Sequence, residues 1–144
     1  MTTTTDTQPD RYQLTWAARA VPNPDMSLTG DYLEFVWLPL LGPSATLVLR
    51  RFGRVLGAPD HHRTHSIGRA ALAAGIGVGD GGGRNAPIMR TLNRLERFGF
   101  IEITDDHIRV NPTVRPVPTG MLDRLPGPSL AVHRAVTATR AGSA

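Results

Sequence analysis

Four polar residues spaced along one short segment have side chains suited to binding nucleic acid. Arg90, Arg94 and Arg97 carry guanidinium groups, and Asn93 carries an amide. A guanidinium forms paired hydrogen bonds with phosphate oxygens or with the major-groove edge of guanine, and an amide matches the edge of adenine. These residue types therefore indicate contacts with phosphates and base edges, provided that one surface presents all four.

The apolar residues between them predict the helix that such a surface needs. Ile88, Leu92 and Leu95 recur at positions i, i+4 and i+7, which is the spacing of one buried helical face. At 100° per residue the four polar residues then lie on the opposite face. We expect this helix to begin at Asn85, a residue type that caps helices, to have a proline in its first turn, and to end near Phe98.

Three further residues complete the candidate set. Arg84 and Asn85 lie at the expected helix start, where backbone N–H groups are free to bind a phosphate. Arg109 belongs to another element, because residues 100–104 and 107–111 alternate between apolar and polar and flank two aspartates, as the strands of a β-hairpin would. The candidate nucleic-acid-binding residues are Arg84, Asn85, Arg90, Asn93, Arg94, Arg97 and Arg109.

Two more helices are predicted before this segment. Pro43 and Gly57 bound a stretch with helical spacing, since proline is favoured in a first turn and glycine just beyond a last one. Ser66 is a suitable cap for a second helix, which we expect to end near Ala74. Residues 75–84 then form a glycine-rich connection to the helix that carries the arginines.

This order of two helices, a turn, a third helix and a hairpin is similar to that of winged helix-turn-helix proteins, and the segment 66–103 resembles that family. The resemblance implies a mainly α fold with a small antiparallel β-hairpin. It also implies sequence-dependent binding of duplex DNA, with the third helix in the major groove and the hairpin on the backbone, and a function in regulating transcription. Residues 75–84 depart from the family because they replace its tight turn. They predict either a flexible insert or a third helix that begins late.

A second resemblance supports an alternative function. The segment Leu38-Pro-Leu-Leu-Gly-Pro-Ser-Ala45 is similar to the entry to the first helix in winged-helix domains of bacterial replication-initiation proteins of the DnaD/DnaB type. The chain also resembles uncharacterised actinobacterial winged-helix proteins. The alternative is a protein-interaction or replication-adaptor module with little DNA binding. It predicts exposed apolar residues on the third helix, whereas DNA binding predicts exposed arginines there.

The sequence also predicts how the chain is divided. Residues 1–27 are rich in Thr, Asp and Pro and are expected to form a flexible N-terminal arm. The winged helix-turn-helix domain is expected over residues 28–115, with residues 31–42 as an apolar lead-in that is either a short helix or extended. Residues 116–144 are expected to form a C-terminal helical extension and tail. This extension either forms a homodimer, which would present two recognition helices to DNA, or folds back over the first helix of its own domain.

The charge of the chain is concentrated in the predicted domain. Its 16 basic residues other than histidine are all arginine; residues 43–115 hold eleven of them against six acids, a balance of +5, and the rest of the chain balances at −1. A positive domain suits a phosphate backbone. The chain has no cysteine, and its longest apolar run, 35–41, is too short to span a membrane. Its first residues lack a basic start followed by an apolar stretch, so no secretory leader is expected. We therefore expect a cytoplasmic protein.

Signals of other functions are weaker. Residues 77–82 match G-x-G-x-x-G, but they follow a predicted helix rather than the strand that a dinucleotide-binding motif requires. His61, His62 and His65 cluster near Asp60 and include zinc-binding side chains, but they lie in a predicted loop, where solvated side chains are expected. No Ser, His and acid are arranged as in a catalytic site. We expect no enzyme activity, no cofactor and no metal site.

Overall fold

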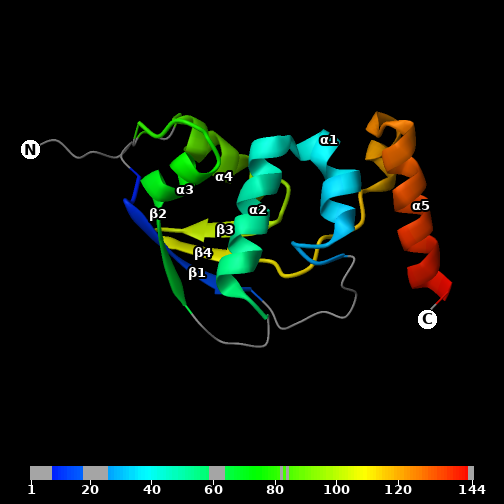
Figure 1. Ribbon diagram of the computed structural model, residues 1–144, viewed down its shortest axis with the longest axis horizontal. Helices are drawn as coiled ribbons and strands as arrows, with labels where there is room; N and C mark the ends of the chain where they lie inside the picture. Colours follow the sequence, from blue (N-terminus) through cyan, green and yellow to red (C-terminus); the bar gives the residue numbers. More distant parts are fainter. Residues whose placement is uncertain (1–7, 18–25, 59–63, 82, 84, 143–144) are drawn as a thin grey trace, which may run out of the picture.

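The computed structural model of the chain describes residues 8–17, 26–58, 64–81, 83 and 85–142 (Figure 1). Four strands form one sheet. Helices cover one face of it, and the last helix lies at one end of the molecule (Figure 1). The elements are β1 (Arg11–Trp16), the π-helix η2 (Leu33–Trp37), α1 (Leu38–Leu41), α2 (Pro43–Leu56), β2 (His65–Gly68), α3 (Arg69–Gly75), α4 (Pro87–Arg97), β3 (Ile101–Thr104), β4 (His107–Val110), the 3₁₀ helix η3 (Thr119–Arg124) and α5 (Gly127–Gly142).

The strands pair in the order β2-β1-β4-β3. β1 is antiparallel to β2 and parallel to β4, and β3 and β4 form an antiparallel hairpin. Tyr12, Leu14, Ile108 and Val110 are buried and alternate with more exposed residues along the two central strands, as expected where one face of a sheet packs on a core. The predicted hairpin is therefore confirmed, but it is half of a larger, mixed sheet.

Two strands differ from what the sequence predicts. Residues 11–16, part of the expected flexible arm, form the central strand β1. Ser66 and Ile67, expected to start the second helix, lie in β2, and α3 begins only after Gly68. The physical reason is pairing with distant segments, because β1 has hydrogen-bonded neighbours on both sides and β2 extends the sheet beyond it. Such pairing outweighs local propensity.

Helices α2 and α4 begin and end where their prolines and glycines predict. Pro43 and Pro87 occupy the first turns, where a missing N–H costs no helical hydrogen bond. Gly57, after α2, has a φ of 72°, and Gly99, after α4, has a φ of 82°. Glycine adopts this left-handed conformation without strain. The predicted first and third helices are thereby confirmed.

The apolar lead-in is helical and changes pitch just before Pro39. In η2 the N–H of Leu38 donates to the carbonyl of Leu33, five residues earlier, as in a π-helix. Pro39 has no N–H with which to continue the ladder, and the wider turn immediately precedes it. Trp37 packs edge-on against Phe100 with the ring centroids 5.1 Å apart. This contact holds the lead-in against the residue that immediately precedes β3.

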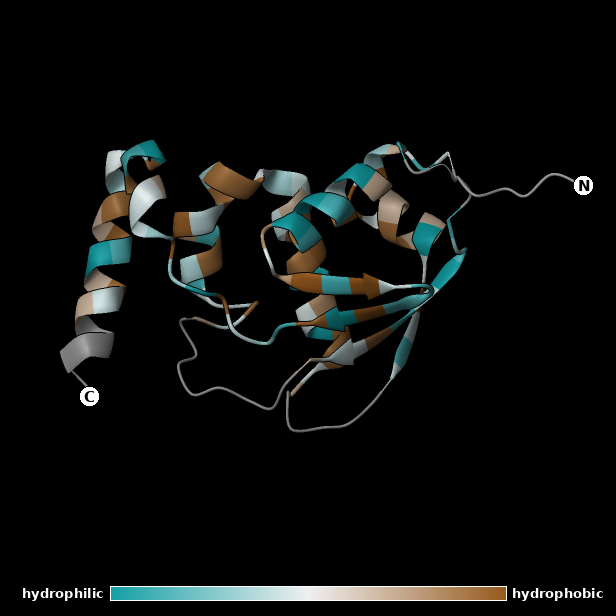
Figure 2. Cartoon of the chain, turned by 180° about the vertical axis from the view of Figure 1, so that it is seen from behind, coloured by the Kyte–Doolittle hydropathy of each residue, from teal (hydrophilic) through white to brown (hydrophobic). Residues whose placement is uncertain are grey.

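The core lies between the helices and one face of the sheet. α2 packs on β1 and on α4, and α4 packs on β3. Ile88, Leu92 and Leu95 of α4 are buried, as their spacing predicts, and Met89 is buried with them. Figure 2 shows the matching pattern, in which hydrophobic and hydrophilic residues alternate along the strands and helices. The polar face of α4 is consequently directed away from the core.

A buried arginine holds the glycine-rich connection between α3 and α4. Arg69 is 6 % exposed; its Nε donates to Asp80 at 2.8 Å and its Nη1 donates to the carbonyl of Gln8 at 2.7 Å. The N–H of Val78 also donates to the carbonyl of Ala73 at 3.0 Å. These hydrogen bonds hold Val78 and Asp80 in place, and α4 begins at Pro87. Residues 82 and 84 of the connection lie outside the described ranges, so the two expected arrangements both stay open.

The C-terminal extension packs on its own chain. α5 contacts η2, and in this buried contact the Tyr32 hydroxyl lies 2.7 Å from Nδ1 of His133. The same hydroxyl accepts a hydrogen bond from the N–H of Val117 at 2.9 Å, which leaves its own proton available to Nδ1. The extension thus folds back, as one of the two expected arrangements requires. It covers the lead-in helix rather than the first helix, α2.

Candidate nucleic-acid interface

The outer face of α4 borders a shallow hollow of about 500 Å³. Arg90, Asn93, Arg94 and Arg97 are exposed and line it, so the structure brings together the four residues that the helical period places on one face. Asn85 lines the same hollow from the connection before α4. The other lining residues are Ser44, Val78, Pro87 and Thr91.

The four polar side chains of α4 differ in how they are held. Arg94 donates from Nη2 to the carbonyl of Leu40 at 2.8 Å, and its guanidinium lies 5.7 Å from the centre of the Phe98 ring. Arg94 therefore fastens α4 to α1 as well as lining the hollow. The side chains of Arg90, Asn93 and Arg97 form no hydrogen bond or ion pair with any residue that the structure describes. Their donors are available to a ligand.

The acidic residue of α4 is directed away from the hollow. Glu96 accepts a hydrogen bond from the N–H of Ile103 at 2.8 Å, which holds its carboxylate at the edge of the hairpin. Among the described residues, those that line the hollow include three arginines and no acid. A concave surface with charges of one sign concentrates the electrostatic potential, so this hollow is suited to an anionic ligand.

Arg109 lies apart from the residues of α4. It projects from the exposed face of β4, and its Nη1 is 3.6 Å from Oε1 of Glu102 on β3. It lines a separate hollow that Glu96 and Glu102 also border. Two exposed aspartates, Asp105 and Asp106, form the turn of the hairpin. The structure therefore does not bring Arg109 together with the α4 arginines, and it surrounds Arg109 with acids that repel phosphate.

The start of α4 has fewer free N–H groups than the sequence predicts. Ala86, and not Asn85, occupies the capping position, and no side chain bonds to the helix there. Pro87 has no N–H, and the N–H of Ile88 donates to the carbonyl of Gly79 at 3.2 Å. Two of the first backbone positions are thus closed to a phosphate. Asn85 lines the hollow through its exposed side chain, without capping α4.

Several residues that the sequence singles out lie outside the described ranges, namely Arg84, Asp60, His61 and His62. His65 is described and lies in β2. Within the described ranges, no three His, Cys, Asp or Glu side chains gather as a metal site would require. No helix in those ranges is both long enough and apolar enough to cross a membrane.

Two residues of the hollow, Ser44 and Val78, do not stand out in the sequence as binding residues. Ser44 lies in the first turn of α2, which packs on α4, and Val78 lies in the connection before α4. The period of α4 alone cannot identify them, because tertiary packing brings them to the hollow. The Ser44 hydroxyl adds a further group able to donate to a phosphate oxygen.

No protein-family model, curated protein or solved structure matches the chain. The case for a function therefore rests on the residues of the hollow and their geometry.

Proposed function

We propose that the chain binds duplex DNA through the outer face of α4, in the manner of a winged helix-turn-helix protein. The observation that carries this proposal is the set Arg90, Asn93 and Arg97. These side chains share one open hollow, and among the described residues they have no partner and the hollow has no acid in its lining. Their donors match phosphate oxygens and the base edges of the major groove.

The dimensions and position of α4 support this proposal. Its 11 residues extend over about 16 Å at 1.5 Å per residue, and a major groove about 12 Å wide admits one α-helix. α4 follows α3 and precedes the hairpin, which is the place of the recognition helix in the proposed arrangement. Arg90 and Asn93 would then meet base edges, and Arg97, nearer the end of the helix, would meet the backbone.

A purely structural role for the arginines is the competing explanation. Arg94 and Arg97 lie in the last turn of α4, where a positive charge stabilises a helix through its macrodipole. Arg90 lies nearer the N-terminus of α4, where the same interaction is unfavourable. The macrodipole therefore does not explain Arg90, whereas contact with a bound anion would.

The alternative function, a protein-interaction module, predicts exposed apolar residues on α4. In the described part of the chain, the exposed large hydrophobic residues are Phe35 and Leu47, which lie on η2 and α2. The surface of α4 thus favours DNA. Regulation of transcription would follow from such binding at specific sites. A homodimer through α5 stays a prediction, which light scattering on the full chain would test.

Fluorescence anisotropy of the full chain with labelled duplexes of random sequence, at several salt concentrations, tests the proposal. Binding should weaken steeply with salt, because phosphate contacts release counterions. Arg90→Ala should bind more weakly than the parent chain. Arg124→Ala is the matched control, because Arg124 is exposed on η3 and does not line the hollow. Absence of binding at low salt, or equal binding by Arg90→Ala and the parent, would contradict the proposal.

A further inference from the structure

A second concave surface lies along α2, from Pro43 to Arg54. We call it the α2 groove; it encloses about 440 Å³ between the lead-in helices, α2 and the end of α3. Leu38, Pro43, Leu47 and Ile76 supply its apolar lining. Leu47 is 47 % exposed, and Leu38 and Ile76 are half-buried. The groove therefore presents more apolar side chains to solvent than the hollow at α4, whose apolar lining residues are Val78 and Pro87.

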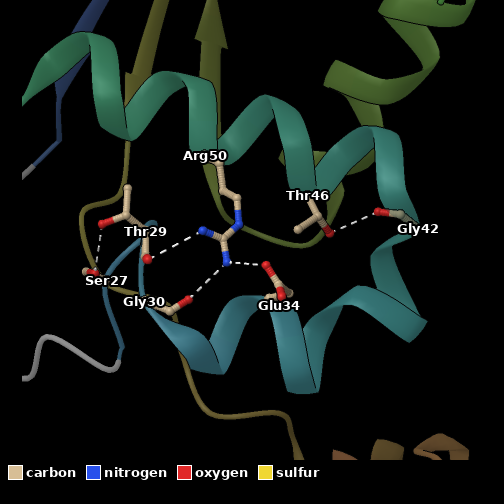
Figure 3. A network of polar contacts seen from close by, with 7 residues as sticks. All are labelled: Ser27, Thr29, Gly30, Glu34, Gly42, Thr46 and Arg50. Atoms are coloured by element: carbon tan, nitrogen blue, oxygen red, sulfur yellow. Dashed lines mark hydrogen bonds and ion pairs between the residues drawn. The ribbon is translucent and has the colours of Figure 1, made fainter. Parts of the chain in front are cut away.

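Three arginines of α2 border the groove, and they are held differently. Arg50 is committed to the fold, because its Nη2 lies 2.7 Å from Oε1 of Glu34 and its guanidinium also reaches two carbonyls of the preceding loop (Figure 3). Arg51 and Arg54 form no hydrogen bond or ion pair with a residue in the described ranges. The charges of the lining balance at +2.

The fold makes room for Arg51 at the groove. Its guanidinium lies over Gly75, the last residue of α3, where a Cβ would come within 2.9 Å of Nη1. Arg54 is exposed one turn later on α2. Both guanidiniums therefore lie beside apolar surface and keep donors for an acidic ligand.

We propose that the α2 groove binds an acidic segment of a partner protein, in which a large apolar side chain lies between carboxylates. The apolar side chain covers Leu47 and Ile76, and the carboxylates pair with Arg51 and Arg54. Exposed apolar surface with a polar rim marks protein interfaces. Arginine is enriched at the energetically dominant positions of such interfaces. A volume of this size holds a few side chains of a peptide.

Other occupants match the groove less well. The phosphates of duplex DNA would pair with Arg51 and Arg54, but its backbone has no large apolar group to cover Leu47. A second copy of this chain carries a net charge of +4, and the exposed turn of its hairpin has aspartates without a large apolar side chain. The inference does not rest on DNA binding, because the α2 groove and the hollow at α4 share no lining residue.

Selection from a phage-displayed library of random peptides on the immobilised full chain tests this inference. The enriched peptides should combine Asp or Glu with Leu, Phe or Trp. One enriched peptide, labelled with fluorescein, is then titrated in anisotropy measurements against the parent chain, Leu47→Ser, Arg54→Glu and Arg90→Ala. We expect Leu47→Ser and Arg54→Glu each to weaken binding roughly tenfold, and Arg90→Ala to bind as the parent does. A peptide with Asn and Gln in place of its acids should lose affinity.

Three outcomes of these experiments would overturn the inference. They are a selection that enriches no peptide, enriched peptides that lack Asp and Glu, and equal peptide affinity for Leu47→Ser and the parent chain. Weaker duplex binding by Arg54→Glu, with no peptide bound, would assign the groove to DNA. A parent chain that self-associates in light scattering, and a monomeric Leu47→Ser, would assign it to a second copy. Circular dichroism melts of the variants serve as the control for folding, since Leu47 and Arg54 are exposed.

Discussion

The hollow at α4 and the α2 groove lie on either side of the first turn of α2, and arginines border both. Ser44 lines the hollow and Pro43 lines the groove. The two surfaces differ in the residues beside the arginines. Polar side chains such as Asn93 outnumber the apolar Val78 and Pro87 in the hollow, whereas apolar side chains such as Leu47 and Ile76 outnumber the polar ones in the groove. In a chain whose basic residues other than histidine are all arginine, charge alone does not distinguish a DNA surface from a peptide surface. The neighbouring side chains do.

The largest effect, on the free energy of unfolding, is expected from a charge placed in the hydrophobic core. Leu92 is fully buried where α4 packs on the rest of the core. Leu92→Asp should lower the free energy of unfolding by about 4 kcal/mol or more, because a carboxylate without a partner is costly to bury. Both binding activities should be lost with the fold.

Leu47→Asp is the matched control for this change, because Leu47 is half exposed on α2. It should alter the free energy of unfolding by about 0.5 kcal/mol or less and affect only peptide binding. Circular dichroism melts compare the two variants. If Leu92→Asp melted with the parent chain, the assignment of α4 to the core would be wrong.

The next effect separates the two surfaces from each other. Arg90→Ala should lose about 1–3 kcal/mol of binding free energy at a preferred duplex and relax the base preference at one position. Arg54→Ala should leave duplex binding unchanged, because Arg54 lines only the α2 groove. Anisotropy isotherms with a selected duplex and a scrambled duplex provide the measurement. If Arg90→Ala and Arg54→Ala lost equal binding free energy on the selected duplex, both surfaces would belong to one DNA-binding site.

The residues of the hollow show how far the sequence predicts a site. Arg90, Asn93 and Arg97 could be identified because a helical period is local, and it places them opposite the buried residues of α4. The second role of Arg94 could not, because its partner is the carbonyl of Leu40, 54 positions earlier in the chain. Ser44 likewise reaches the hollow only through the packing of α2 on α4.

The elements of the fold likewise fall into those that local sequence signals predict and those that depend on distant partners. Helices α2 and α4 and the β3–β4 hairpin follow from local signals, namely periodicity, prolines, glycines and a two-residue turn. β1 carries an alternating pattern over residues 11–16, but its place in the sheet depends on partners more than 50 residues away, such as Ser66 and Ile108. An isolated strand of this length has no stability of its own. The sequence therefore predicts the helices better than the sheet.

A change of pH offers a way to separate the two surfaces. η2 forms a wall of the α2 groove but does not line the hollow at α4, and η2 contacts α5, which carries a buried histidine. Burial lowers the pKa of His133, and the charge of Arg134 lowers this pKa further. The Tyr32 hydroxyl lies 2.7 Å from Nδ1 of this ring, and a neutral ring can accept a hydrogen bond there. Because the folded-state pKa lies below the unfolded value of about 6.5, the stabilisation is present above that value. It is lost as the pH falls from there through the folded-state pKa.

His133→Gln should remove this part of the pH dependence of unfolding, and it should cost about 0.5–1.5 kcal/mol at neutral pH through the lost hydrogen bond. Urea unfolding between about pH 5 and pH 8 gives the comparison with the parent chain. His107→Gln is the control, because His107 is exposed on β4. An unchanged slope in His133→Gln would show that the pair does not contribute. Peptide binding should respond to this pH range more than duplex binding does.

The smallest effect is expected at Arg109, where the structure and the family resemblance predict different results. A hairpin that rests on the DNA backbone would use Arg109 for a phosphate contact, and Arg109→Ala would then reduce the salt slope by about one unit. The structure instead places its guanidinium 3.6 Å from Glu102, and two aspartates form the adjacent turn. An exposed ion pair of this kind contributes about 0–1 kcal/mol, and the surrounding carboxylates oppose the approach of phosphate.

We therefore expect Arg109→Ala to change duplex affinity by about 0.5 kcal/mol or less, and Glu102→Gln to strengthen binding slightly at low salt. Isotherms across a salt series measure both variants. A loss of a full unit in the slope for Arg109→Ala would mean that the hairpin turns toward the DNA when the chain binds, and that the contact surface extends beyond the hollow at α4.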